Sequence, residues 1–296
     1  MPRRSARLGI ERTTGTDSVR DHSKQQVKDH WEHEPCGTRS GASPDRETWF
    51  DEIYESRYEG TKYLRDFARF DEARGKRVLE IGVGAGSDFR NWVENGAHVT
   101  GVDLTEAAVR LTSEHLKVKG LETVNHELRL ADAEHLPFED DTYDIVYSYG
   151  VLHVTPDTER AFAEAYRVLK PGGQLRAMIY HVPSWTGFML WVRYGMLARR
   201  PLVSQRQVIF ERLESPGTKA YTLQEARTLV ASAGFDVDSA ESRLCPGDFL
   251  DIVPSAQYRR WYYRVIWALY PRWLVALLGD RFGLNLLIHA VKPASD

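Results

Sequence analysis

The chain has 296 residues, of which 42% are hydrophobic, 27% charged and 11% aromatic. This composition supports a sizeable buried core and excludes disordered, fibrous and low-complexity proteins. Thirty-nine basic against 42 acidic residues give a net charge of −3, which disfavours a general nucleic-acid binder.

The first quarter of the chain precedes any strand pattern. Residues 1–25 contain five arginines but no apolar run, so we expect a flexible tail without a secretory signal. Residues 26–75 place apolar side chains at three- and four-residue spacing, which predicts a helical lid. The two cysteines, Cys36 and Cys245, are too few for a disulfide framework, and the expected location is the cytoplasm.

Residues 76–296 alternate between strand and helix patterns. Helix starts are expected at Thr105, at Thr155-Pro156 and at the capping box Thr222-Leu223-Gln224-Glu225. Lys170-Pro171-Gly172-Gly173 is expected to end a helix before the fifth strand. Apolar runs predict strands at 77–81, 98–102, 126–130, 143–149, 174–180, 235–237 and 285–291. This order predicts an α/β fold with a Rossmann-like, seven-stranded, mostly parallel sheet and helices on both faces, whose ligand lies at the carboxyl ends of the strands.

Two segments, about 181–220 and 244–283, interrupt the alternation. We expect them to pack together as a cap that encloses an apolar ligand, because they hold five of the eight tryptophans: Trp185, Trp191, Trp261, Trp267 and Trp273. Seven arginines are interleaved with these rings, so peripheral contact with anionic lipid is an alternative role. The most apolar stretch, 261–279, is interrupted by charges and a proline, and no membrane span is expected.

A glycine turn links the first predicted strand to the next helix. Its spacing is Glu80-x-Gly82-x-Gly84-x-Gly86, and the sixth position of a dinucleotide pattern G-x-G-x-x-G is here Ser87. Asp103 ends the second strand, where a carboxylate accepts hydrogen bonds from both hydroxyls of a ribose. Asp132 follows the third strand and can accept from an exocyclic adenine amine. Together these residues indicate a nucleoside ligand other than a dinucleotide.

Three further motifs follow in the chain. They are Ala131-Asp132-Ala133-Glu134-His135-Leu136-Pro137-Phe138, Tyr149-Gly150-Val151-Leu152-His153 and Arg167-Val168-Leu169-Lys170-Pro171-Gly172-Gly173. In this order, and with the glycine turn and Asp103, residues 76–180 resemble the class I S-adenosylmethionine-dependent methyltransferases. The resemblance is to the broad group that includes quinone C-methyltransferases, and it implies S-adenosylmethionine as the cofactor.

The resemblance also implies roles for individual residues. The methionine part of the cofactor would contact the glycine turn, the ribose would bind to the end of the second strand, and the adenine would lie beyond it. The residues concerned are, in that order, Glu80, Gly82, Gly84 and Gly86, then Asp103, then Leu104, Asp132 and Ala133. Tyr149 would lie beside the donor methyl, and Arg57 and Tyr58 would close over the cofactor, with Arg57 facing its carboxylate.

His153 and His181 follow the fourth and fifth strands, where a general base can reach an acceptor. The family often has two consecutive histidines at the first position, but here Val154 follows His153. Methyl transfer from a sulfonium is a direct displacement, which depends on orientation more than on a base. Cys36 is expected to be a turn residue, and no metal site is expected.

The predicted function is transfer of a methyl group to a small, largely apolar acceptor, whose reacting atom the sequence leaves open. An NAD-dependent short-chain oxidoreductase is one alternative, but it requires a catalytic Tyr-x-x-x-Lys after the fourth or fifth strand, which we do not expect here. A non-catalytic nucleoside-binding module is the other alternative, and it would lack an acceptor pocket. No nucleic-acid partner is expected, and the oligomeric state is left open.

Overall fold

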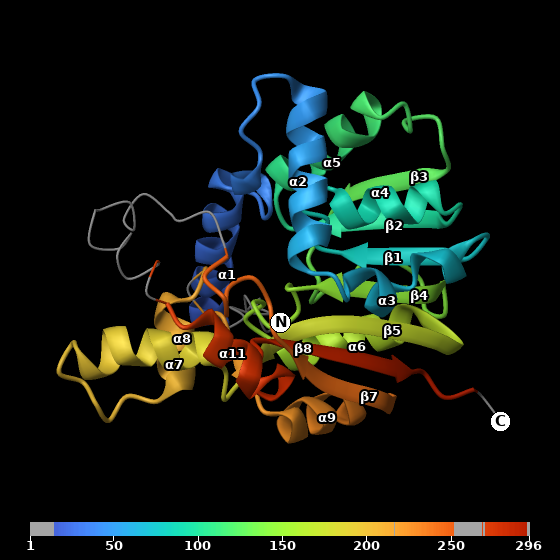
Figure 1. Cartoon of the computed structure of the whole chain (residues 1–296). Coiled ribbons are helices and arrows are strands. Elements are labelled where there is room, and N and C mark those ends of the chain that lie inside the picture. Colours follow the sequence, from blue (N-terminus) through green and yellow to red (C-terminus); the bar gives the residue numbers. More distant parts are fainter. Residues whose placement is uncertain (1–14, 216, 252–267, 269, 295–296) are drawn as a thin grey trace, which may run out of the picture.

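The computed structural model describes residues 15–215, 217–251, 268 and 270–294. They form one sheet of eight strands in the order β3-β2-β1-β4-β5-β8-β7, with β6 beside β5 (Figure 1). The strands are β1 Arg77–Ile81, β2 His98–Asp103, β3 His126–Leu130, β4 Tyr143–Tyr149, β5 Leu169–His181, β6 Ala220–Tyr221, β7 Asp236–Arg243 and β8 Asn285–Val291. β1 to β6 pair in parallel, whereas β8 is antiparallel to both β5 and β7. The mostly parallel sheet was predicted with seven strands; the eighth is the two-residue β6.

Helices cover both faces of this sheet, as predicted. One apolar cluster joins α3, α4 and α5 to the sheet, and a second joins α6 and α9 to the opposite face. The helices are α1 Gly15–His33, α2 Arg46–Gly60, α3 Leu64–Ala68, α4 Ser87–Glu94, α5 Glu106–Val118, α6 Thr158–Val168, α7 Trp185–Trp191, α8 Gln205–Arg212, α9 Leu223–Ser232 and α11 Arg272–Leu278. Short turns of other helix types are η1 Thr38–Ser40, η2 Phe70–Ala73, the π-helix η3 Val192–Met196 and η5 Asp280–Phe282. None of the described helices is both long enough and apolar enough to cross a bilayer.

Local sequence signals predict most helix starts correctly. One helix start and one turn differ from the prediction. Thr105 caps α5, and Thr222 and Glu225 form the expected capping box of α9. The helix expected to start at Thr155-Pro156 instead starts at Thr158, because the Asp157 side chain accepts a hydrogen bond from the amide of Arg160. The Lys170–Gly173 segment, expected as a turn before the fifth strand, lies inside β5, and a register shift against β4 accommodates it.

The N-terminal segment also differs from the prediction. Residues 15–25, expected as part of a flexible tail, belong to α1. Two of its side chains hold α1 against the core: Lys24 pairs with Asp132, and Glu32 accepts hydrogen bonds from the first amides of α5, Glu106 N and Ala107 N, at 2.9 and 3.0 Å. The Glu32 carboxylate satisfies free helix N-terminal donors. Figure 1 shows α1 on the side of the sheet to which the parallel strands point.

The two insertions contact each other through a buried aspartate. Asp248 accepts hydrogen bonds from the amide and hydroxyl of Thr186 at 3.1 and 2.6 Å, and from the amides of Cys245 and Leu284 at 3.0 Å. Tyr270 donates to the Asp248 carbonyl at 2.5 Å and accepts from the Trp185 indole. The second insertion's Trp261 and Trp267, with the arginines near them, lie outside the described residues.

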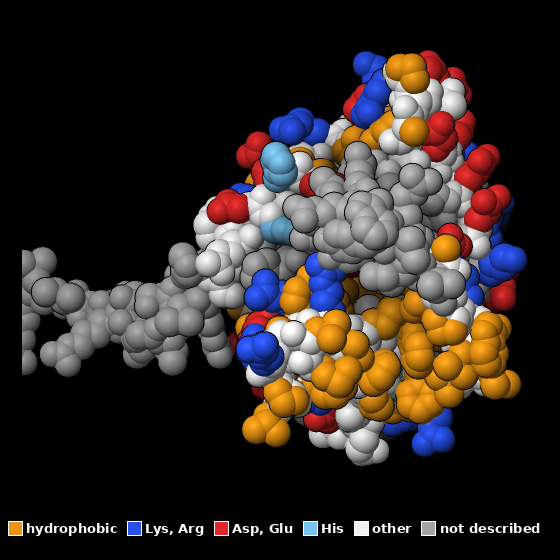
Figure 2. All heavy atoms as spheres, turned by 60° about the vertical axis from the view of Figure 1, so that its left-hand side comes forward, with side chains coloured by type: hydrophobic (Ala, Val, Ile, Leu, Met, Phe, Trp, Pro, Cys, Tyr) orange, Lys and Arg blue, Asp and Glu red, His pale blue; other side chains and the backbone are white. Residues whose placement is uncertain are grey.

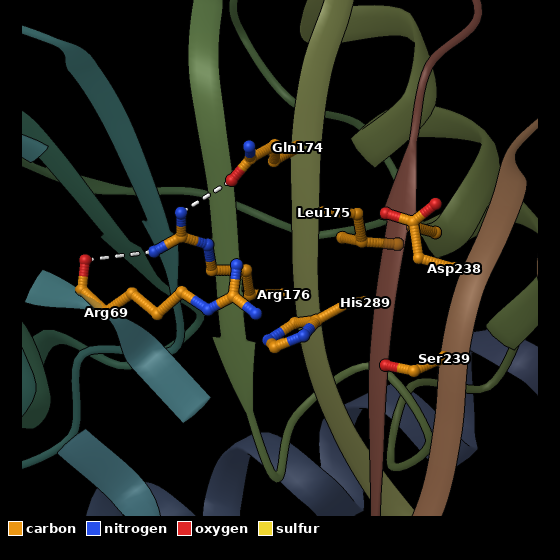
Figure 3. Close-up of a pocket in the computed structure, with 8 residues that line it drawn as sticks. Arg69, Gln174, Leu175, Arg176, Asp238, Ser239 and His289 are labelled. Atoms are coloured by element: carbon orange, nitrogen blue, oxygen red, sulfur yellow. Dashed lines mark hydrogen bonds between the residues drawn. The ribbon is translucent and has the colours of Figure 1, made fainter. Parts of the chain in front are cut away.

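A polar cavity of about 250 Å³ lies on the sheet near the N-terminal ends of the parallel strands (Figure 3). Its lining includes the buried side chain of Arg176, which donates to the carbonyl of Arg69 at 3.1 Å, to Gln174 at 2.5 Å and to Glu72 at 2.6 Å. These bonds fasten η2 to β5. The cavity is therefore at the end of the sheet opposite the glycine turn, and its arginine has a structural role.

Candidate cofactor and acceptor site

The turn after β1 requires glycine at each predicted position. Gly82, Gly84 and Gly86 have positive φ angles of 86°, 52° and 79°, which favour glycine over residues with a Cβ. A Cβ on Gly82 would also come within 2.1 Å of Val151, and one on Gly86 within 3.0 Å of Thr112. The backbone of this turn is thus held close to its neighbours, with the start of α4 directly behind it.

Asp103 ends β2 beside this turn. Its carboxylate accepts from the amide of Gly84 at 3.3 Å and from the amide and hydroxyl of Thr105 at 3.0 and 2.8 Å. Burial raises the pKa of Asp103 despite these bonds. The predicted ribose-binding carboxylate and the predicted glycine turn are therefore adjacent at the carboxyl edge of β1 and β2. Leu104 follows Asp103 and is half-buried.

Glu80, inside β1, is a buried carboxylate. It is 2% exposed, and its Oε2 has no hydrogen-bond partner among the described residues. Burial, and then the negative charge of Asp88, raise the pKa of Glu80 well above its ordinary value. A buried hydrogen-bond acceptor without a donor destabilises the folded protein. An ammonium group bound near the turn would supply the missing donor to Glu80.

Asp132 lies past β3, as predicted, but its carboxylate already has a partner. Lys24 of α1 contacts Asp132 at 2.6 Å and Glu134 at 2.5 Å. Burial favours the neutral acid, but the Lys24 ammonium outweighs it and lowers the pKa of Asp132. Ala133, between the two acids, is buried. Asp132, Glu134 and His135 also have the spacing of a cation site, but the Lys24 ammonium lies against both carboxylates.

Arg57 and Tyr58 of α2 reach the site through a residue that the sequence analysis did not single out. Asp88, in the first turn of α4, is 4% exposed and forms an ion pair with Arg57. The hydroxyls of Tyr58 and Tyr147 each donate to Asp88 at 2.6 Å. Burial opposes ionisation of Asp88, but Arg57 lowers its pKa overall. Arg57, predicted to face the carboxylate of the cofactor, thus faces a carboxylate of the protein.

Tyr149, at the end of β4, belongs to a polar cluster built from three distant segments. Asn285, the first residue of β8, donates to the hydroxyls of Tyr149 and Tyr63 at 2.8 Å each. The two hydroxyls are 3.4 Å apart, and the Arg57 guanidinium lies 4.8 Å from the centre of the Tyr149 ring. These contacts therefore hold the Tyr149 ring in place at the carboxyl end of β4, beside β8.

A known protein family matches the part of the chain that contains most of these residues. Residues 79–177 match the family model of a methyltransferase domain. The chain contains a class I S-adenosylmethionine-dependent methyltransferase domain. The matched residues begin in β1 and end in β5, so the match includes the glycine turn, Asp103, Asp132 and Tyr149.

Individual relatives share this domain over part of their length. A phthiotriol/phenolphthiotriol dimycocerosates methyltransferase of Mycobacterium tuberculosis is 34% identical over 165 residues, which is 53% of this chain and 55% of that protein. An arsenite methyltransferase of Halobacterium salinarum is 39% identical over 106 residues, 35% of this chain and 27% of that protein. This chain thus aligns with about half or less of these relatives.

A solved structure shares the fold over most of the chain. It is the putative methyltransferase in complex with the Trm112 methyltransferase activator of Haloferax volcanii, with a TM-score of 0.62 and 19% identity over 91% of this chain and 99% of that chain. At this identity the likeness concerns the fold alone. The methyltransferase domain therefore implies S-adenosylmethionine as the cofactor, whereas the two sequence relatives are named for very different acceptors.

The two histidines predicted as bases lie next to the domain's β4 and β5, in different surroundings. His153 is fully buried, and neither ring nitrogen has a hydrogen-bond partner in the described part of the chain. Burial lowers the pKa of His153 to about 3. The Nδ1 of His181 lies 3.0 Å from the carbonyl oxygen of Gly283, and burial lowers the pKa of His181 as well. Both rings are neutral at pH 7, and His153 packs against Tyr180 at 4.4 Å between ring centres.

Three residues that the sequence analysis did not connect, Cys36, Tyr180 and Glu214, lie near one another beside the domain's glycine turn. The carbonyl oxygen of Cys36 would lie 3.3 Å from a Cβ on Gly84. Cys36 is exposed, yet burial and then the charge of Glu214 raise the pKa of its thiol to about 11. Glu214 accepts from the Tyr180 hydroxyl at 2.6 Å, and burial raises its pKa. Cys36, Tyr180 and Glu214 thus influence one another beside the glycine turn.

No sequence motif marks Glu214, because it stands outside the domain's α/β repeat, in the first insertion. Its φ of 53° is unusual for a residue with a Cβ, and such backbone strain is concentrated at functional sites. Asp88 was more accessible to sequence reasoning, since it lies two residues after Gly86 in the first turn of a helix.

One sequence expectation about the oxidoreductase alternative was wrong. A Tyr-x-x-x-Lys spacing does occur, from Tyr166 to Lys170. These residues lie at the end of α6 and the start of β5, at the end of the sheet away from the glycine turn. Lys170 pairs with Asp144 at 2.6 Å, and the Lys292 ammonium lies 4.6 Å from the centre of the Tyr166 ring. The pair therefore cannot act on a ligand at the cofactor edge.

Proposed function

We propose that the protein transfers the methyl group of S-adenosylmethionine to a small, largely apolar acceptor. The observation that carries the proposal is the contact between the Gly84 amide and Asp103 at the carboxyl edge of β1 and β2. It joins the glycine turn to the ribose-binding acid inside the segment that matches a methyltransferase domain. Ligands of open α/β sheets bind at this edge.

The side chains at this edge fit S-adenosylmethionine. Asp103 would accept from the ribose hydroxyls, while the unpartnered Oε2 of Glu80 would accept from the ammonium of the methionine part. Asp132 would accept a hydrogen bond from the adenine amine, either while it keeps its ion pair with Lys24 or after that ion pair has opened. Arg57 stays with Asp88 and holds α2 against α4. When bound, the cofactor supplies a methyl group that its sulfonium has already activated.

The acceptor would bind over β4 and β5. Asp103 and Asp132 would hold the nucleoside over β2 and β3, and Glu80 would hold the methionine part over β1. In the order β3-β2-β1-β4-β5, this leaves β4 and β5 for the acceptor. Tyr149 and Tyr180 lie at the carboxyl ends of these two strands and on one face of the sheet, in the same apolar cluster. Aromatic walls of this kind suit an apolar ligand.

Glu214 would accept the proton that an acceptor hydroxyl loses. If the acceptor reacts through a hydroxyl, the bound cofactor would supply the methyl group and leave as a neutral thioether, and the hydroxyl proton would pass to the Glu214 carboxylate. A carboxylate with a raised pKa is a stronger base than an ordinary one. The Tyr180 hydroxyl orients it at 2.6 Å. The geometry favours Glu214 over the fully buried His153 for this role.

Isothermal titration calorimetry tests the cofactor half of the proposal. S-adenosylhomocysteine should bind the wild type, and NAD should not. Asp103→Ala should weaken S-adenosylhomocysteine binding by about 1.5–3 kcal/mol, the scale of a hydrogen bond to a charged group. Asp236→Ala, at the exposed start of β7, is the matched control and should leave the affinity unchanged. Equal affinity in both variants would remove the assignment of Asp103, and tighter binding of NAD would replace the proposed function.

A further inference from the structure

The outer surface of the cap has a chemistry unlike the rest of the described protein. Of the exposed large hydrophobic side chains in the described residues, all but Leu130 come from the two insertions. Those of the first insertion are Phe188, Met196, Leu197, Leu202 and Phe210, and those of the second are Trp273, Leu277 and Leu278. Figure 2 shows apolar side chains gathered on the face that presents α7, α8 and α11. We call these eight residues the apolar patch.

The most exposed members of the patch are not needed for packing. Leu202 is 98% exposed, Leu277 75%, Leu197 74% and Trp273 71%. Single exposed leucines are common on proteins, whereas a contiguous exposed group of this size marks an interaction surface. The membership of one tryptophan among leucines is typical of segments that enter a lipid interface.

The charge around the patch is strongly positive. Residues 185–212 contain five arginines and a single glutamate, in a protein whose net charge is −3. Arg200 and Arg206 belong to surface ion pairs, with Glu211 and Glu225, and Arg199 stands between Leu197 and Leu202. Arginines beside protruding leucines complement a surface whose outer layer is anionic and whose inner layer is apolar.

We propose that the apolar patch docks on an anionic membrane surface, with Leu197 and Leu202 inserted among the lipid chains and the arginines at the phosphates. A second copy of the chain is a poorer occupant. Identical patches would face each other in a symmetric dimer, and the arginines of one copy would meet those of the other. A lipid surface satisfies both features, since phosphates accept from arginine and acyl chains accept the leucines.

The position of the patch gives the docking a consequence. The connection from α8 leads directly to Glu214, so the first insertion carries five residues of the apolar patch as well as this carboxylate. Docking through α7 and α8 would bring Glu214 close to the lipid surface. The proposal concerns the outer face only, and it holds whether or not Glu214 takes part in methyl transfer.

Co-sedimentation with vesicles tests the docking. The full chain is mixed with vesicles of phosphatidylcholine alone, and with vesicles in which a third of the lipid is phosphatidylglycerol. The wild type should sediment with the anionic vesicles and much less with the neutral ones. The double variant Leu197→Asp/Leu202→Asp should bind the anionic vesicles more than tenfold more weakly, because two apolar side chains no longer enter the lipid. Arg199→Gln should weaken binding about fivefold.

Leu130→Asp is the matched control, because Leu130 is 48% exposed on β3, outside the two insertions. It should sediment like the wild type. The proposal is overturned if the wild type binds neither kind of vesicle, or if the double variant binds as well as the wild type. It is also overturned if light scattering shows a concentration-dependent dimer that the double variant abolishes while vesicles remain unbound. Because all these positions are exposed, circular dichroism should show unchanged folding in every variant.

Discussion

The proposed cofactor edge over β1 to β3 and the proposed acceptor region over β4 and β5 are built in opposite ways. At the cofactor edge, the decisive residues lie within one continuous α/β repeat, and each follows its own strand. In the acceptor region, Tyr63, Tyr149 and Asn285 meet from segments up to 222 positions apart, and Glu214 comes from an insertion. The first region is thus specified by local motifs, whereas the second depends on packing between distant segments. This difference explains why cofactor residues are recognisable when the acceptor is not.

The largest expected effect sharpens the cofactor side of this comparison. Asp88→Asn should lower the free energy of unfolding by about 3 kcal/mol, because Arg57 would lose its ionised partner in a largely buried network. Urea denaturation monitored by tryptophan fluorescence measures the change. Asp236→Asn, at an exposed strand end, should change it by less than about 0.5 kcal/mol. A loss below 1 kcal/mol for Asp88→Asn would show that the network is a solvated surface pair.

The next prediction concerns the acceptor side, where His153 is fully buried. The pKa of His153 is about 3 in the folded protein against an ordinary 6.5. Below pH 6.5 the unfolded chain therefore binds a proton that the folded chain does not, and stability falls as the pH falls. Between pH 7 and pH 5 the wild type should lose about 2 kcal/mol more stability than His153→Phe, which keeps an aromatic ring beside Tyr180.

Urea denaturation at the two pH values measures this difference. His135→Phe, at a site that is 68% exposed, should show the same pH dependence as the wild type. If His153→Phe also matched the wild type, the His153 ring would be accessible to water and protons, and its proposed role as a base would gain support over that of Glu214.

The smallest effect tests whether the two regions meet at Cys36. Glu214→Gln should lower the pKa of the Cys36 thiol, because the charge of Glu214 disfavours the thiolate. In a Cys245→Ala background, alkylation of Cys36 by iodoacetamide at pH 9 should become about fivefold faster, which corresponds to ~1 kcal/mol of charge interaction. Glu211→Gln, on the exposed side of α8, should leave the rate unchanged. Equal alkylation rates in both variants would show that the charge of Glu214 does not act on Cys36 beside the glycine turn.

Sequence patterns anticipated the glycine turn and the acid beside it for a physical reason. The turn from Gly82 to Gly86 requires three residues without a Cβ, and Asp103 must be the last residue of its strand to reach the Gly84 amide. Such constraints act between near neighbours and are visible as spacing. The same holds for the capping box of α9, while the start of α6 was misplaced by two residues because Asp157 competes with Thr155 for the cap.

The sequence by itself determined the α/β repeat, the glycine turn, the acids after β2 and β3 and the two insertions. Only the tertiary structure decided that Arg57 pairs with Asp88, that Lys24 reaches Asp132, and that Glu214 accepts a hydrogen bond from Tyr180. Those contacts join residues from 31 to 108 positions apart. Side-chain partners at such separations depend on how helices and insertions pack on the sheet, which no local spacing specifies.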